Sequence, residues 1–183
     1  MRARSRACLL LLGLCGAAAL PGQTLDLPER GVPELAALTG FGYSAKINRG
    51  TTEEQVLVLE PQVGFRLGPR FEYMIEGHLA RYFRPDGFAA GLVPVGARYF
   101  FGGGKVAPYM ELGAGFCWTN LDVDVINRRF NFILQGGVGV VGSTEPGHSW
   151  TVEARWVHYS NAGTVLPNLG LNAVVLLVGW RFR

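Results

Sequence analysis

Two side chains that together can perform nucleophilic catalysis stand two positions apart near the end of the chain. They are His158 and Ser160. On a β-strand such residues point to the same side with Cα atoms roughly 6.5 Å apart, so an imidazole nitrogen can approach a serine hydroxyl and act as its base. This spacing is compatible with nucleophilic catalysis by a serine. The chain contains no Gly-x-Ser-x-Gly sequence, which argues against the nucleophile elbow of α/β-hydrolases.

Further polar groups follow this pair. Asn161 and Gly163 offer an amide side chain and a backbone N–H to a developing oxyanion. Asn172 has the strand parity of Val174, so we expect it to face the same side as His158. The histidines lack acidic or cysteine partners at ligand spacing, so we expect no metal and no cofactor. A His-x-Ser pair at a membrane interface can also bind lipid headgroups without catalysis, and this alternative stays open.

The segments that must position these residues alternate between apolar and polar residues. Large apolar side chains share one face of each segment, and glycine, serine and charged residues share the other. In the fourth segment this parity puts Val93 and Val95 on the apolar face and Arg98 on the polar face. The alternating segments span residues 39–48, 57–67, 71–83, 93–101, 110–118, 130–135, 150–160 and 174–182.

This pattern predicts an all-β fold. Eight amphipathic segments of about ten residues match a small eight-stranded antiparallel transmembrane β-barrel of the outer membrane. The polar face carries the smaller side chains, so it suits a narrow lumen, and the apolar face would meet lipid. We expect a buried polar network in the lumen, formed by Glu60, Glu72, Glu76, Glu111 and Glu153 with Lys46, Arg66, Arg98, Arg155 and Arg181.

The connections between segments alternate in length. Residues 68–70, 102–105 and 144–147 form compact turns rich in glycine and proline, as expected on the periplasmic side. The connections at 49–54, 84–91, 120–127 and 162–171 are longer and would face outside. The seventh segment then runs outward, which places His158 and Ser160 on the lipid-facing side near the outer leaflet.

The N-terminus has the form of a secretory signal peptide. A basic stretch precedes the apolar run at 7–20, which is too short to span a bilayer. We expect a signal peptide at 1–19, a periplasmic leader at 20–38 and the barrel at 39–183. Removing the three signal arginines cancels the formal net charge of +3, so no basic face for nucleic acid is indicated. Cys117 then remains as the single cysteine and cannot form an internal disulfide.

Several motifs resemble the PagL family of lipid A deacylases. The C-terminal signature is HYSNAG at 158–163, followed by PNxGxN at 167–172. Upstream, PYxELGAGF at 108–116 and FNFxxQxGxG at 130–139 are also similar to that family. The resemblance covers the C-terminal part of the chain by motif and the first strands by pattern only. It implies an eight-stranded outer-membrane barrel that hydrolyses the ester-linked acyl chain at the 3 position of lipid A.

The resemblance also implies roles for individual residues. Ser160 would be the nucleophile, His158 the general base and acid, and Asn161 with the Gly163 N–H the oxyanion site. Asn172 departs from the family, which has a glutamate there to orient the histidine. An amide oxygen can still accept the imidazole N–H but supplies no negative charge, and the equivalent change in a serine protease costs about 10⁴ in turnover.

Substrate contacts are expected around the same outer surface. By parity, Arg128 and Arg81 could meet lipid A phosphates or anionic sugars, although plain snorkelling to the interface is the favoured explanation of both. Phe130, Phe132 and Trp156 could border an acyl groove, or belong to an aromatic girdle. The expected partners are lipid A or lipopolysaccharide and the membrane, with no nucleic acid. A homodimer stays open.

Two other functions compete with a lipid A esterase. A non-catalytic outer-membrane barrel, serving as a scaffold or adhesin, is favoured by the Asn172 departure. A soluble ligand-binding barrel would require the larger apolar side chains to point inward, against the patterning described above.

Overall fold

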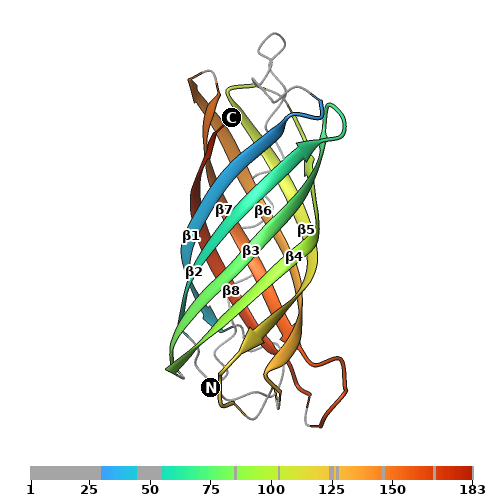
Figure 1. Ribbon diagram of the computed structural model, residues 1–183. Coiled ribbons are helices and arrows are strands. Elements are labelled where there is room, and N and C mark those ends of the chain that lie inside the picture. Colours follow the sequence, from blue (N-terminus) through green and yellow to red (C-terminus); the bar gives the residue numbers. More distant parts are fainter. Residues whose placement is uncertain are drawn as a thin grey trace, which may run out of the picture.

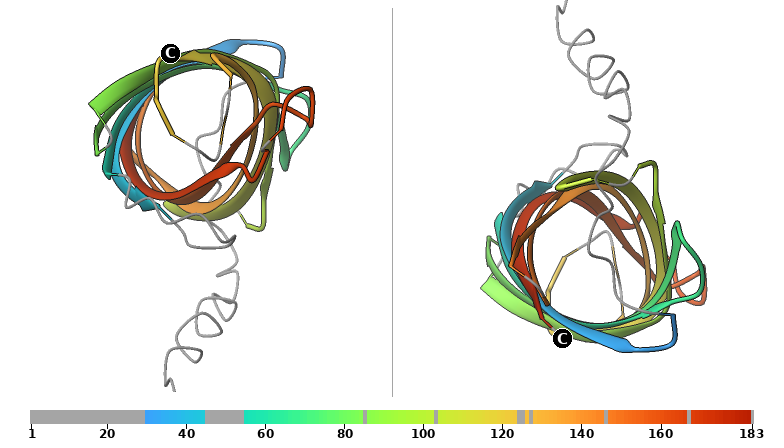
Figure 2. Two further views of the ribbon diagram at one scale, coloured as in Figure 1. Left: turned by 90° about the horizontal axis from the view of Figure 1, so that it is seen from below. Right: turned by 90° about the horizontal axis from the view of Figure 1, so that it is seen from above.

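The protein folds into a single closed β-barrel. The computed structural model describes residues 30–44, 55–84, 86–102, 104–123, 126, 128–145, 147–166 and 168–182. Its strands are β1 (Pro33–Ser44), β2 (Gln55–Arg66), β3 (Phe71–Arg84), β4 (Asp86–Phe100), β5 (Val106–Thr119), β6 (Phe130–Glu145), β7 (His148–Ser160) and β8 (Leu171–Phe182). Each strand pairs antiparallel with the next, and β1 pairs with β8 to close the barrel (Figures 1 and 2). The predicted eight-stranded antiparallel barrel is confirmed. No helix among the described residues is long and apolar enough to cross a membrane.

The alternation in the sequence corresponds to the two faces of the wall. Apolar side chains such as Leu112, Leu176 and Val138 are exposed on the outside, at 61%, 61% and 54% of their surface. Charged side chains such as Arg98 and Arg155 are fully buried in the lumen. A lipid-facing apolar wall around a polar interior is the arrangement of membrane barrels.

The first strand begins earlier than the sequence predicts. β1 starts at Pro33 rather than Thr39, so residues 33–38 belong to the barrel and not to the leader. Proline is tolerated as the first residue of a strand, and Glu34 then points inward, where its Oε1 accepts a hydrogen bond of 2.9 Å from Arg181. The predicted signal peptide at 1–19 and the leader up to residue 29 lie outside the described residues.

A network of ion pairs fills one half of the lumen. Arg155 contacts Glu60 and Glu76 at 2.7 Å each, and Arg98 contacts Glu111 at 2.9 Å. The predicted network is therefore present, with Lys46 outside the described residues. Arg66 is an exception, because its guanidinium lies 4.1 Å from the centre of the Phe100 ring and has no hydrogen-bond partner among the described residues.

The other half of the lumen is apolar, which the polar pattern did not predict. Its buried side chains include Leu38, Val58, Tyr82, Ile133, Val157, Val175 and Leu177. Leu121, Val123 and Ile126 of the β5–β6 connection join the same cluster. The lumen is thus packed with side chains in this half, to which these three residues of the connection contribute.

One strand face was predicted incorrectly. Val93 is 1% exposed and points into the lumen, whereas Val95 is 62% exposed on the outside. The register between β4 and β5 shifts between Leu92 and Val95, where a β-bulge inserts an extra residue. A bulge reverses the parity on one side of it, and simple alternation cannot reveal this.

Candidate active site

The candidate site lies on the outer wall at the end of the β7–β8 hairpin. This hairpin projects at the lower right of Figure 1, at the opposite end of the barrel from the C-terminus. Trp156, His158 and Ser160 follow one another on the outward face of β7 and are half-buried. The pairing register places Asn172 of β8 directly opposite His158, and Phe132 of β6 opposite Ser160.

His158 and Asn172 are joined as the parity argument predicts. The imidazole Nδ1 lies 2.9 Å from the Asn172 Oδ1. The indole Nε1 of Trp156 donates to the same oxygen at 3.2 Å. Because an indole nitrogen can only donate, the shared atom is the carbonyl oxygen, and Nδ1 must carry a proton to bond it. The neutral His158 therefore has Nε2 unprotonated and available as a base.

Ser160 stands beside this base without yet contacting it. Among the described residues, no hydrogen bond joins His158 and Ser160, although both side chains project from the same face of β7. The serine hydroxyl rotates freely about its Cβ, and catalytic hydrogen bonds are often formed only once substrate is bound. The arrangement can support proton transfer from the Ser160 Oγ to the His158 Nε2.

The imidazole of His158 is confined by two neighbours. Its ring stacks on the indole of Trp156, with centroids 5.6 Å apart and planes inclined by 17°. Gly170, at the end of the β7–β8 connection, lies so close that a Cβ there would be 2.3 Å from the His158 Cε1. Gly170 also has φ +73°, in the left-handed region that favours glycine.

We expect Gly170→Ala to displace His158 and reduce any activity of the site at least tenfold. The methyl group would overlap the imidazole, and a shift of about 1 Å at a catalytic group can cost about 10²-fold. Gly147→Ala is the matched control, because Gly147 has φ +82° but open space around its Cβ position. Rates and melting temperatures of both variants would be compared, and equal rates would show that Gly170 does not position His158.

Asn161 organises the connection that follows the site. Its backbone N–H donates to the Asn168 Oδ1 at 3.1 Å, and its Nδ2 donates to the Val165 carbonyl at 3.0 Å. Its Oδ1 accepts the Gly163 N–H at 2.9 Å. The side chain is buried, since Asn161 follows Ser160 directly and its strand parity is opposite. The connection also holds Ala162 at φ 53°, which is costly for a residue with a Cβ.

The structure does not present the two expected oxyanion donors to Ser160. The Asn161 amide bonds to Val165, and the Gly163 N–H bonds to Asn161. In this arrangement both groups stabilise the connection. The sequence does not reveal that the Gly163 N–H bonds to the neighbouring Asn161 side chain, so both groups were expected to be free donors.

The expected substrate contacts divide into two groups. Phe132 lies beside Ser160, and Phe130 stacks on Phe116 at 6.1 Å and contacts Phe132 edge-on at 5.6 Å. Arg128 is exposed just before Phe130. Arg81 is on β3, which three strands separate from β7 in both directions around the barrel. It pairs there with Asp86, so the structure does not bring it to the site.

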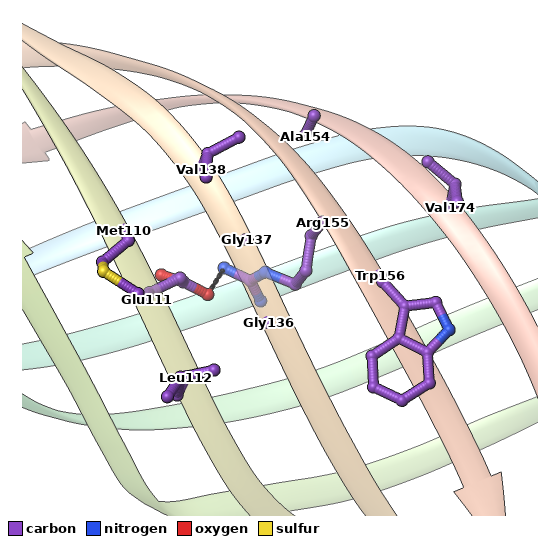
Figure 3. A pocket seen from close by; sticks show the side chains of 10 residues that line it. All are labelled: Met110, Glu111, Leu112, Gly136, Gly137, Val138, Ala154, Arg155, Trp156 and Val174. Carbon is purple, nitrogen blue, oxygen red and sulfur yellow. Dashed lines mark ion pairs between the residues drawn. The ribbon is translucent and has the colours of Figure 1, made fainter. Parts of the chain in front are cut away.

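A shallow apolar depression of about 380 Å³ adjoins Trp156 on the outer wall. Gly136 on β6 leaves it open because it has no side chain on the outer face, and Leu112, Val138, Trp156 and Val174 surround it (Figure 3). Beneath it, the Arg155–Glu111 ion pair of 2.7 Å faces the lumen. The sequence pattern missed this depression, since strand pairing is needed to bring Gly136 opposite both Trp156 and Leu112.

Other groups do not change the chemistry of the site. Glu153 points into the lumen and bonds to Arg155 and Tyr109, as its parity predicts, so it does not act on His158. Within the described residues, no group of three His, Cys, Asp or Glu side chains is arranged to hold a metal ion.

The lipid-facing barrel and the His–Ser cluster on its wall define an outer-membrane β-barrel protein with a candidate esterase site. The chain belongs to the PagL family, because the family model described as lipid A 3-O-deacylase (PagL) matches residues 40–181. It is a lipid A deacylase-like protein of the Gram-negative outer membrane.

Solved structures share the fold at low sequence identity. Neisserial surface protein A (NspA) is 14% identical with a TM-score of 0.66, over 82% of this chain and 96% of that chain. The outer membrane enzyme PagL is 17% identical with a TM-score of 0.61, over 80% of this chain and 97% of that chain. No curated protein matches the sequence. A homodimer finds no support in these similarities.

Proposed function

We propose that this protein hydrolyses the ester-linked acyl chain at the 3 position of lipid A, with Ser160 as nucleophile and His158 as general base. The observation that carries this proposal is the His158–Asn172 hydrogen bond of 2.9 Å. In the neutral imidazole this bond leaves Nε2 without a proton, on the same lipid-facing strand face as Ser160. Membership of the PagL family, whose model is described as lipid A 3-O-deacylase, supports this substrate class and this ester bond.

The reaction would proceed in two steps. The Ser160 Oγ attacks the ester carbonyl and transfers its proton to the His158 Nε2, and the imidazolium then protonates the departing sugar oxygen. Water next hydrolyses the acyl-enzyme, with His158 first removing and then returning a proton. Asn172 holds the imidazole by its Nδ1 hydrogen throughout, but a neutral amide stabilises the imidazolium less than a carboxylate would.

The tetrahedral intermediate needs hydrogen-bond donors near Ser160. In this proposal the Asn161 amide and the Gly163 N–H serve the oxyanion when substrate is bound. The Gly163 N–H can do so only if its hydrogen bond to the Asn161 Oδ1 opens, and the Asn161 Nδ2 must turn from the Val165 carbonyl, to which it donates in the structure. The buried position of Asn161 makes this opening an added cost of the reaction. Arg128 is the cationic candidate for a lipid A phosphate, because it is exposed beside Phe130 at the same end.

In this proposal the apolar depression beside Trp156 receives the acyl chain. We expect Gly136→Leu to fill it and to raise KM about tenfold for long-chain substrate while changing kcat less, because removal of uniform binding acts on KM. A Cβ at Gly136 meets only the flexible Leu112 side chain, at 3.2 Å, and a backbone oxygen at 3.7 Å. Ala90→Leu is the matched control, since Ala90 lines a similar outer depression between β2, β3 and β4. Equal KM values for the two variants would contradict this location.

The direct test combines product and enzyme analysis. The purified barrel would be incubated with lipid A in mixed micelles, and mass spectrometry would follow loss of one hydroxyacyl chain. In parallel, a long-chain alkyl fluorophosphonate would be added, and the labelled peptide would be identified. We expect chain loss and a single phosphonate adduct on Ser160. A folded protein that gives neither result would refute the esterase.

The alternative is a non-catalytic outer-membrane barrel that acts as a scaffold or adhesin. The specific observation in its favour is Asn172, which supplies no charge to His158 at a position where the family resemblance implies glutamate. Under this alternative Ser160 does not react with the alkyl fluorophosphonate even when the barrel is folded. Cleavage of a signal peptide after residue 19 is part of either proposal, and N-terminal sequencing of the exported protein tests it.

A further inference from the structure

The Asn172 amide raises a problem that a carboxylate would not. Its two ends differ, because the oxygen accepts hydrogen bonds whereas the nitrogen only donates them. If the nitrogen faced His158, the imidazole would have to accept at Nδ1 and carry its proton on Nε2. That tautomer cannot take a proton from Ser160, and the wrong tautomer accounts for part of the large loss when an amide replaces a catalytic carboxylate.

We infer that Trp156 is a positioning residue that holds the Asn172 amide with its oxygen toward His158, and this inference rests on the proposed function. The Trp156 Nε1 donates to Asn172 Oδ1 at 3.2 Å, beside the His158 Nδ1 contact of 2.9 Å. With the amide flipped, its NH₂ group would face the donor-only indole. Asn172 is only 6% exposed, so water cannot readily compensate for such a mismatch.

The same indole also contacts the imidazole through its face. The rings of Trp156 and His158 are stacked, with 5.6 Å between centroids and 17° between planes. An indole face attracts cations through its quadrupole. When His158 accepts the Ser160 proton it becomes a cation against this face, which compensates in part for the charge that Asn172 lacks. Trp156 thus acts on His158 in two ways, through the Asn172 oxygen and through stacking.

The first test reads the His158 tautomer and needs no enzymatic activity. The full chain in detergent micelles would be labelled with ¹⁵N-histidine, and the His158 signals would be assigned by their loss in His158→Gln. We expect the neutral ring to be protonated at Nδ1 in the native protein. In Trp156→Phe, which keeps an aromatic face but has no N–H, we expect a mixture with the Nε2-protonated form. Nδ1 protonation that is unchanged in Trp156→Phe would overturn the inference, as would Nε2 protonation in the native protein.

The second test separates orientation of the amide from simple packing. A carboxylate has two equivalent oxygens and needs no orientation, so the effect of Trp156 should depend on residue 172. We expect Trp156→Phe to lower acyl-chain release about tenfold in the native background, in line with one lost hydrogen bond. In the Asn172→Asp background we expect less than a twofold effect. Equal losses of acyl-chain release in the native and Asn172→Asp backgrounds would show that Trp156 contributes only packing.

Trp180→Phe is the control for both measurements. Trp180 is also exposed on the outer wall, at 45%, but it lies near the other end of β8 beside His148. It should change neither the tautomer nor the rate. If no variant released acyl chains, the proposed function would fail, whereas the tautomer measurement would still decide the role of Trp156.

Discussion

Replacing Ser160 by alanine is expected to lower acyl-chain release by at least about 10³-fold. Without the hydroxyl no acyl-enzyme can form, and His158 has no proton to accept. In a serine protease, removal of the serine or the histidine each costs about 10⁶ in turnover. We expect a smaller loss here, because an active site with an amide at position 172 starts from a lower rate. The measurement is single-turnover release of the hydroxyacyl chain from lipid A.

The His158→Gln variant and the double variant test whether Ser160 and His158 act together. Residues that act as one unit are strongly non-additive, so His158→Gln should lose about as much activity as Ser160→Ala, and the double variant should lose no more than either. Ser160 is half-buried on the outer wall, away from the ion pairs of the lumen, so the folded barrel of the variant should keep its heat-dependent mobility on gels. A folded Ser160→Ala protein that retains release above one tenth of the native rate would exclude Ser160 as the nucleophile.

Replacing Asn172 by aspartate is expected to raise acyl-chain release by about 10² or more. Aspartate has the shape of asparagine, and its carboxylate can accept both the His158 and the Trp156 hydrogen bonds. It also stabilises the imidazolium that forms as Ser160 attacks. The reverse change in a serine protease costs about 10⁴, partly through the tautomer. The gain here should be smaller, because Trp156 already orients the native amide.

This gain should come with a loss of stability. Asn172 is 6% exposed, and burying a charge costs several kcal/mol unless partners compensate for it. We therefore expect Asn172→Asp to lower the free energy of unfolding, while Asn172→Leu, which removes the acceptor, loses activity. Asn172→Glu places the longer side chain that the family resemblance implies and should also gain activity if it reaches Nδ1. No gain in either acidic variant, with the barrel folded, would show that the amide does not limit the rate.

Much of the candidate site could be predicted from strand parity. Residues two apart share a face, so His158, Ser160 and Trp156 had to project together from β7. Asn172 had to face the same side because it shares its parity with the apolar residues of β8. The same rule places Glu153 in the lumen, away from His158. The face on which a residue lies depends only on its position within its own strand and not on the neighbouring strands. The sequence was therefore sufficient for these assignments.

Features that depend on distances across strands could not be predicted in this way. Arg81 has the right parity but lies on the far side of the barrel, because position around the ring depends on strand order and closure. Val93 points inward because a bulge between paired strands shifts the register. The Gly163 N–H donates to the Asn161 Oδ1 and the Asn161 Nδ2 donates to the Val165 carbonyl, two contacts that depend on the folded conformation of the connection.

The sequence by itself determined the barrel, its lipid-facing wall and the outward direction of His158, Ser160 and Asn172. A period-two pattern carries this information locally, and a membrane requires every backbone group to pair within a closed sheet. Only the tertiary structure placed the Trp156 indole and the His158 imidazole on one Asn172 oxygen. The register of β7 against β8 brings those three side chains together, and register is a property of the paired strands rather than of either segment alone.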